Sequence, residues 1–152
     1  MTRTTWAAAT AAVLLLASPA GAQNAAPRST ADGVFTAAQA AAGEAAYQSN
    51  CAGCHGLDLR KTDAEAPDLT EGPFRYGWNG KTMAERVEKI RTTMPKPNVK
   101  SLPDQTYVDI VAYILSFNGV PAGSETLGSD MAKLEAITIE VPHAKGGGGR
   151  RR

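Results

Sequence analysis

Cys51 and Cys54 stand three residues apart, and His55 directly follows the second cysteine. Two thiols at this spacing can reach the two vinyl groups on neighbouring haem pyrroles, and the adjacent imidazole can then bind the iron. Thioether bonds of this kind keep the haem attached to the chain when the protein opens transiently. The run from Cys51 to His55 therefore predicts a covalent attachment site for haem c.

Other chemistries are open to the same three side chains. A structural zinc site needs four ligands at suitable spacing, and the chain has only two cysteines and two histidines. Because His55 adjoins Cys54, these two side chains and Cys51 cannot easily converge on one tetrahedral ion. A thioredoxin-like redox pair belongs in a βαβ setting, and the sequence around Cys51 is helical. A disulfide between Cys51 and Cys54 is the plainest alternative for an exported protein.

The iron of an electron carrier usually has a second protein ligand, and a Met thioether opposite His raises the reduction potential. Met94 lies 39 residues after His55, in Thr93-Met94-Pro95, where a predicted helix gives way to a loop. The other candidates lie in the signal segment, at the start of a helix as a packing residue, or beyond the last large helix: Met1, Met83, Met131 and His143. Met94 is therefore the predicted sixth ligand, and His143 is interpreted as a surface residue.

Helices are expected to position these residues. Thr36 and Gln39 form a capping box that opens a helix reaching about Tyr47, and a loop then carries Cys51 to Leu69. Thr82 and Glu85 form a second capping box, whose helix ends before Pro95. The clearest apolar stripe has helical spacing and comprises Tyr107, Ile110, Val111, Ile114 and Leu115, with Asn118-Gly119 as its stop.

Weaker signals surround these helices. Glycines and a proline predict an irregular stretch over 72–80. A short helix is expected over 129–136, and residues 137–139 have extended character but no obvious partner strand.

The N-terminus reads as a secretory signal peptide. One positive charge at Arg3 precedes the apolar run 6–17, and small residues at 20–22 offer a cleavage site near Ala22. The run is too short for a membrane span, which needs about 20 apolar residues. We expect a signal peptide over 1–22, a flexible leader over 23–35, a haem domain over 36–119, a C-terminal extension over 120–145 and a disordered Gly/Arg tail over 146–152. The mature protein is thus expected in the periplasm without an integral membrane anchor.

The charge of the chain limits its possible partners, and its composition indicates how its core must be filled. Without Arg3 the chain has 15 basic and 15 acidic residues, and without the Arg150–Arg152 tail as well the body is mildly acidic. Nucleic-acid binding, which needs a concentrated basic face, is therefore excluded. Much of the 43% hydrophobic content is alanine, so a domain this small needs something else, such as haem, to fill its core.

These features resemble the class I cytochromes c over Thr36–Gly119. Gly43 and Tyr47 resemble the family's Gly-x-x-x-aromatic pattern, and Ile110 and Tyr113 resemble the pattern of its C-terminal helix. In the family these two helices cross at right angles, and the glycine permits their close approach. The resemblance implies an all-α fold: a small cytochrome c-like helical domain wrapped around one covalently bound haem.

The resemblance also implies roles for single residues. Pro67 follows His55 by twelve residues, like the family's proline, whose carbonyl accepts a hydrogen bond from the ligand histidine and fixes its ring. Leu69 resembles the leucine that packs on the haem, and Trp78 resembles a tryptophan that binds a haem propionate. Met94, in a Met-Pro context, resembles the axial methionine.

A closer likeness is to the small cytochromes that serve quinoprotein dehydrogenases or are fused to them. Phe74-x-x-x-Trp78, Thr93-Met94-Pro95 and Asn118-Gly119 carry it, whereas the segment after Gly119 departs from the core pattern. The resemblance implies one-electron transfer rather than catalysis. Its partners would be redox proteins: a dehydrogenase donor and an oxidase or another cytochrome as acceptor.

An open iron site would give different functions, a peroxidase-like haem enzyme or a haem ligand sensor. The carboxylates available for acid–base work are expected on helix faces or in a cap, where a solvated charge is the simpler interpretation: Glu85, Glu88 and Asp104. Cations near the Met94 side are expected to guide an acidic partner, with an ordinary soluble surface as the alternative: Arg91, Lys96 and Lys100.

Overall fold

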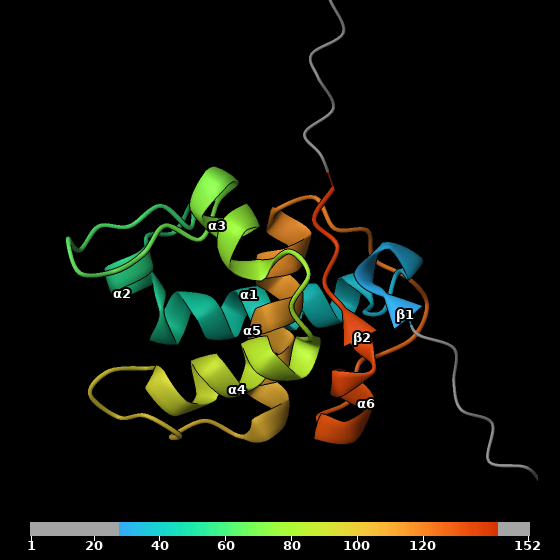
Figure 1. Ribbon diagram of the computed structural model, residues 1–152. Coiled ribbons are helices and arrows are strands. Elements are labelled where there is room, and N and C mark those ends of the chain that lie inside the picture. Colours follow the sequence, from blue (N-terminus) through green and yellow to red (C-terminus); the bar gives the residue numbers. More distant parts are fainter. Residues whose placement is uncertain (1–27, 143–152) are drawn as a thin grey trace, which may run out of the picture.

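The structure is a computed structural model that describes residues 28–142. Its elements, in chain order, are β1 (Arg28–Ser29), η1 (Thr30–Asp32), α1 (Ala37–Asn50), α2 (Ala52–His55), α3 (Glu71–Trp78), α4 (Met83–Thr93), α5 (Asp104–Phe117), α6 (Met131–Glu135) and β2 (Ile137–Thr138). Helices dominate, and in the described part of the chain the strands form one short parallel pair (Figure 1). The expected all-α class is confirmed.

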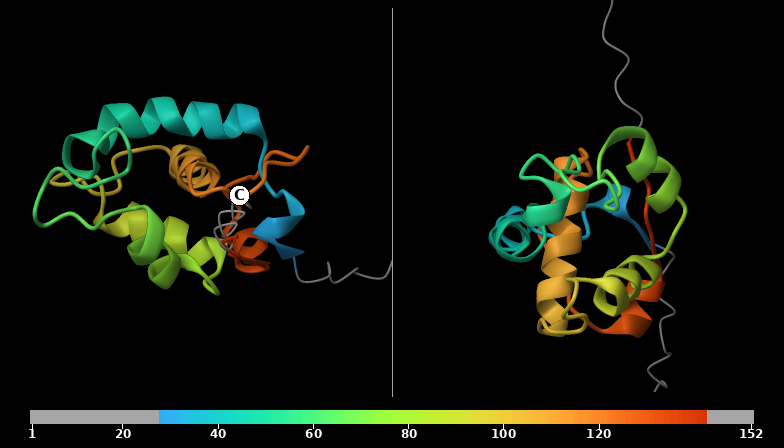
Figure 2. Two further views of the ribbon diagram at one scale, coloured as in Figure 1. Left: turned by 90° about the horizontal axis from the view of Figure 1, so that it is seen from above. Right: turned by 90° about the vertical axis from the view of Figure 1, so that its left-hand side faces the viewer.

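The centre of the fold is the crossing of α1 and α5. Each helix is seen end-on in the view of Figure 2 that shows the other from the side, so the two run crosswise. Gly43 sits at the contact, where a Cβ atom would lie only 1.8 Å from the carbonyl oxygen of Asp109. Beside it the buried Tyr47 ring packs on Tyr113 with centroids 5.3 Å apart. The close helix crossing expected at Gly43 is confirmed.

The helix starts and stops follow the capping residues. The Thr36 hydroxyl accepts a hydrogen bond from the Gln39 amide at 3.0 Å. The Thr82–Glu85 box is complete, with bonds of 2.8 and 3.1 Å. α4 ends at Thr93, and its C-cap Met94 is extended, because the helical conformation is disfavoured for a residue that precedes proline.

α3 corrects the irregular stretch expected over 72–80. Pro73 lies in the first turn of α3, where its missing N–H is not needed by the helix. Phe74 and Trp78, one turn apart, are both buried and stack with ring centroids 5.0 Å apart. This buried aromatic pair outweighs the weak helix propensity of the two glycines.

The ends of the described chain are more ordered than the sequence suggested. Of the flexible leader expected over 23–35, the described residues 28–35 form β1 and η1, and Val34 and Phe35 lie in the core. β2 finds its partner in β1, in the register Arg28 to Ile137. The Thr30 hydroxyl also donates to the Glu140 carbonyl at 3.0 Å and accepts from the Glu140 amide at 2.9 Å.

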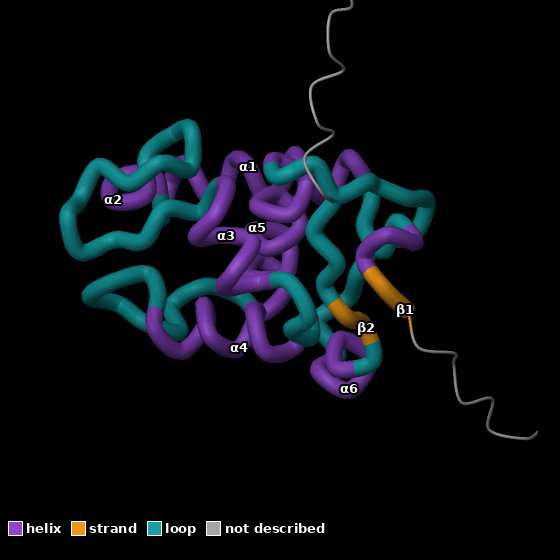
Figure 3. The backbone as a smooth tube through the Cα atoms, turned by 45° about the horizontal axis from the view of Figure 1, so that its top comes forward, coloured by secondary structure: helices purple, strands orange, loops and turns teal. Residues whose placement is uncertain are grey.

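The C-terminal extension is part of the core. Its buried apolar side chains are Val120, Leu127, Leu134, Ile137, Ile139 and Val141. The Gln39 side chain of α1 bonds both the amide and the carbonyl of Leu127, at 2.9 and 2.7 Å. The strands and α6 lie at the end of the molecule away from α2 (Figure 3). Within residues 28–142, the helices are each too short or too polar to cross a membrane.

Candidate haem site

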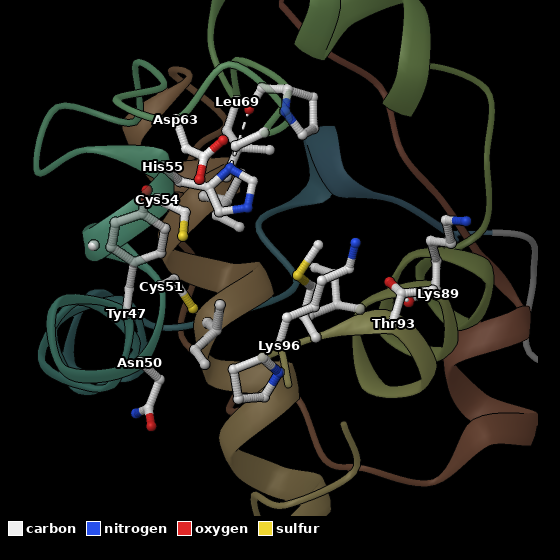
Figure 4. A pocket seen from close by; sticks show the side chains of 18 of the residues that line it. Tyr47, Asn50, Cys51, Cys54, His55, Asp63, Leu69, Lys89, Thr93 and Lys96 are labelled. Carbon is white, nitrogen blue, oxygen red and sulfur yellow. Dashed lines mark hydrogen bonds between the residues drawn. The ribbon is translucent and has the colours of Figure 1, made fainter. Parts of the chain in front are cut away.

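A cavity of about 330 Å³ opens between α2, the loop that follows it, α4 and α5. All seven predicted site residues line this cavity: Cys51, Cys54, His55, Pro67, Leu69, Trp78 and Met94. Figure 4 shows His55 and the two cysteines on one side, with Thr93 and Lys96 of the α4 end across from them. Cys51 and Met94 thus line the same cavity, although they lie 43 positions apart in the sequence.

The attachment motif is presented by a bend between two helices. Cys51 caps the end of α1 and the start of α2, and its carbonyl accepts the His55 amide at 3.0 Å. Both cysteines carry free thiols. Burial raises the pKa of the Cys51 thiol to about 11, so before attachment it is protonated and a weak nucleophile at neutral pH.

His55 is oriented by a single hydrogen bond. Its ring is buried, and its Nδ1 lies 3.0 Å from the Pro67 carbonyl oxygen. If Nδ1 carries the proton, as an amide carbonyl partner requires, Nε2 is left with its lone pair, which is the state that binds a metal. The geometry implied by the family resemblance is therefore present at this pair.

The loop after α2 is held firmly enough to keep Pro67 in place. Gly56 adopts a positive φ of 75°, and a Cβ atom there would lie 2.1 Å from the Arg60 carbonyl oxygen. Its own carbonyl accepts a bond of 2.9 Å from the buried Tyr47 hydroxyl, whose pKa is raised chiefly by burial. Further along, the Leu69 amide donates to the Leu59 carbonyl at 2.9 Å.

Met94 is the methionine that faces this cavity among those in residues 28–142. Met83 is fully buried in the hydrophobic core, as expected of a packing residue. Met131 is partly exposed on α6 and lines a separate, small hollow. His143, the alternative ligand, lies outside the described residues.

Arg86 was missed by the sequence reasoning. It lines the cavity, and its Nε is buried without a hydrogen-bond partner among the described residues. Its guanidinium carbon lies 6.0 Å from the centre of the Trp78 ring. The available signal was helical spacing, since Arg86, Ile90 and Thr93 recur on one face of α4 and all line the cavity.

The cavity fits haem on several independent grounds. Apolar side chains, including Leu69, Ile110 and Ile114, supply much of its wall, as a porphyrin face requires. A buried guanidinium nitrogen without a hydrogen-bond partner is costly, and the carboxylate of a haem propionate would satisfy Arg86 Nε. The two thiols and an imidazole stand on one side of the cavity, and a thioether stands on the other. The thiols suit attachment to the haem vinyl groups, and imidazole with thioether is the axial donor pair of a low-spin cytochrome iron.

The carboxylates considered for acid–base work lie on helix faces or in a cap, as the sequence indicated, whereas Arg91, considered for docking, is already paired. Glu85 is engaged in the Thr82 cap, and Arg91 pairs with Glu88 at 2.6 Å and with Asp104 at 3.7 Å. The three carboxylates therefore lie in caps and ion pairs rather than in the cavity wall.

Comparison with known proteins agrees with the fold and the site. The family described as "Cytochrome C oxidase, cbb3-type, subunit III" matches residues 38–114. The chain is 28% identical over 88 residues to "Cbb3-type cytochrome c oxidase subunit CcoP" of Azospirillum brasilense, which covers 55% of this chain and 30% of that protein. The chain thus spans under a third of this curated relative. No solved structure matches it.

A helical domain with paired thiols, a carbonyl-oriented histidine and a facing thioether is a haem-binding domain of the cytochrome c type. The chain belongs to the class I c-type cytochrome family. It binds haem c covalently and serves electron transfer. When bound, the haem supplies a one-electron iron couple, and the chain supplies the ligands, the burial and the hydrogen bonds that set its potential.

Proposed function

We propose that the chain is a periplasmic, single-haem electron carrier that moves one electron at a time between redox proteins and catalyses no bond change itself. Cys51 and Cys54 attach the haem, and His55 and Met94 bind its iron. The observation that carries this proposal is that His55 and Met94 border the same cavity from opposite elements, α2 and the end of α4. With both axial positions taken, the iron has no place for a substrate.

The supporting residues act on the potential and the retention of the haem. Pro67 orients His55 through its carbonyl, and Leu69 covers the haem face. Trp78 contributes to propionate binding from the cavity wall. A neutral thioether favours Fe(II) over Fe(III), which suits a carrier that accepts electrons from a dehydrogenase.

We propose a quinoprotein dehydrogenase as the donor and an oxidase or another cytochrome as the acceptor. The sequence likeness to dehydrogenase-linked cytochromes supports the donor, and the oxidase-subunit relative supports a redox protein as partner. Lys89 and Lys96, which line the cavity, supply positive charge for an acidic partner, whereas Arg91 is already paired. Complementary charge mainly raises the rate of association.

The test of axial ligation is a set of spectra on the purified holoprotein. The oxidised wild type should show the weak far-red absorption of Met-ligated haem, and the reduced form should not bind carbon monoxide readily. Met94→Ala should remove that band, lower the potential and allow carbon monoxide to bind, whereas Met83→Ala should change none of these properties. A wild type that already binds carbon monoxide would point to an open site and to the enzyme or sensor function.

Covalent attachment and export are tested separately. Acidified organic solvent should not extract the haem from the wild type, and Cys51→Ala combined with Cys54→Ala should yield a poorly folded apoprotein. The mass of the protein recovered from the periplasm should correspond to cleavage near Ala22. A cytoplasmic product of full length would contradict the proposed location.

A further inference from the structure

The loop that carries Met94 is tied to α5 by one buried hydroxyl. Tyr107, in the first turn of α5, is 1% exposed. Its hydroxyl donates to the Met94 carbonyl at 3.3 Å and accepts from the Leu102 amide at 3.3 Å. One side chain thus joins the two ends of the loop between α4 and α5.

The rest of this loop has little to hold it. Residues 96–101 are exposed to solvent. The Lys100 amide donates to the Arg91 carbonyl at 3.1 Å, and the exposed Asp104 pairs with Arg91 at 3.7 Å. Ion pairs with an exposed partner contribute little, so the buried Tyr107 hydroxyl is the stronger tie.

The position of this tie matters because it acts on the main chain of the ligand residue. The Met94 amide already donates to the Ile90 carbonyl at 2.8 Å, which fixes its N-terminal side to α4. The Tyr107 hydroxyl fixes its C-terminal side to α5. For the Met94 side chain to leave the iron by a movement of the loop, the Tyr107 bonds must break.

We propose that Tyr107 is a positioning residue: its hydroxyl closes the Met94 loop and thereby limits how readily an external ligand replaces Met94 at the iron. The proposal rests on the proposed ligation by Met94. It assigns no contact between Tyr107 and the iron, since Tyr107 does not line the cavity. A structural residue of equal burial would affect stability without affecting ligand exchange.

The matched variants are Tyr107→Phe and Tyr113→Phe in the full-length holoprotein. Both remove one oxygen from a buried ring of α5, but Tyr113 packs against Tyr47 and Phe117. The measurement is titration of the ferric protein with imidazole, together with the far-red band and the midpoint potential. Tyr107→Phe should bind imidazole about tenfold more tightly, the effect of losing one or two buried hydrogen bonds, with the potential close to wild type. Tyr113→Phe should match the wild type.

A second measurement uses the wild type and so does not depend on a variant folding. When imidazole displaces Met94, the Leu102 amide should be released from Tyr107. The hydrogen exchange of the Leu102 amide should then accelerate. An unchanged Leu102 exchange rate, or equal imidazole affinities for wild type and Tyr107→Phe, would overturn the role of Tyr107. If Met94→Ala also leaves the far-red band intact, Met94 ligation fails as well. If Met94→Ala loses the far-red band but Tyr107→Phe binds imidazole as the wild type does, the Tyr107 proposal is refuted and Met94 ligation stands.

Discussion

Gly43→Ala is expected to destabilise the holoprotein strongly, although alanine is the better helix former. The added Cβ would lie 1.8 Å from the Asp109 carbonyl oxygen and 2.4 Å from its carbon, and both atoms are backbone. A relaxed carbon–oxygen contact needs about 3.3 Å, so α1 and α5 would have to separate by roughly 1.5 Å. No rotamer change can relieve this contact.

The magnitude follows from two opposing terms. Replacing a helical glycine by alanine at an open position gains up to about 1 kcal/mol. Overpacking costs about 1–3 kcal/mol and occasionally more, and a backbone clash of this size belongs at the upper end. The net loss should be about 2–3 kcal/mol, which lowers the melting temperature by roughly 8–12 °C for a domain of this size.

Gly77→Ala is the matched control. Gly77 also lies in a helix, α3, but a Cβ atom there would meet nothing within 4 Å. Thermal unfolding of both variants, followed by circular dichroism on holoprotein, should show Gly77→Ala at or above the wild-type midpoint and Gly43→Ala far below it. If Gly43→Ala and Gly77→Ala unfold at the same temperature, α1 and α5 do not cross closely at Gly43.

Three further outcomes can be measured. Leu134→Ala should lower the free energy of unfolding by about 2–5 kcal/mol, because this side chain of the extension is fully buried; Met131→Ala on the same helix, 38% exposed, should have little effect in denaturant titrations. Arg86→Met should lower the midpoint potential by roughly 40 mV, because a cation near the haem destabilises Fe(III) relative to Fe(II) by about 1 kcal/mol. Lys100→Met should leave the potential unchanged, and spectroelectrochemistry on the two variants measures the difference. Deleting the Gly/Arg tail 146–152 should leave the haem spectrum and the far-red band unchanged, and altered axial ligation would contradict the expectation that haem binding does not need this tail.

The sequence specified the haem side of the molecule well because its signals are local. The Cys51–His55 motif and the Thr82–Glu85 box act over a few residues, and spacing alone is sufficient to recognise them. The irregular region expected before α4 was wrong for a tertiary reason: the buried pair of Phe74 and Trp78 stabilises a helix that Gly and Pro content argues against.

The two chain ends could not be predicted in this way. β1 and β2 are two residues each, and they are stable only because they pair with each other and with neighbouring backbone. The Ile139 amide donates to the Lys81 carbonyl at 2.7 Å, and the Gly80 amide returns to the Ile139 carbonyl at 2.8 Å. Contacts between positions nearly 60 residues apart leave no periodic trace in the sequence, so the extension looked separate from the haem domain.

α5 links the two sides of the cavity. At its start the Tyr107 hydroxyl holds the Met94 carbonyl, and just after its end the Asn118 side chain donates to the Leu69 carbonyl at 2.9 Å. Between them Ile110 and Ile114 line the cavity. Gly43 fixes this same helix against α1, whose last residue adjoins Cys51. A displacement at the Gly43 crossing would therefore move the Met94 tie relative to the attachment site, so Gly43→Ala should raise imidazole affinity as well as lower stability, whereas Leu134→Ala should lower stability alone.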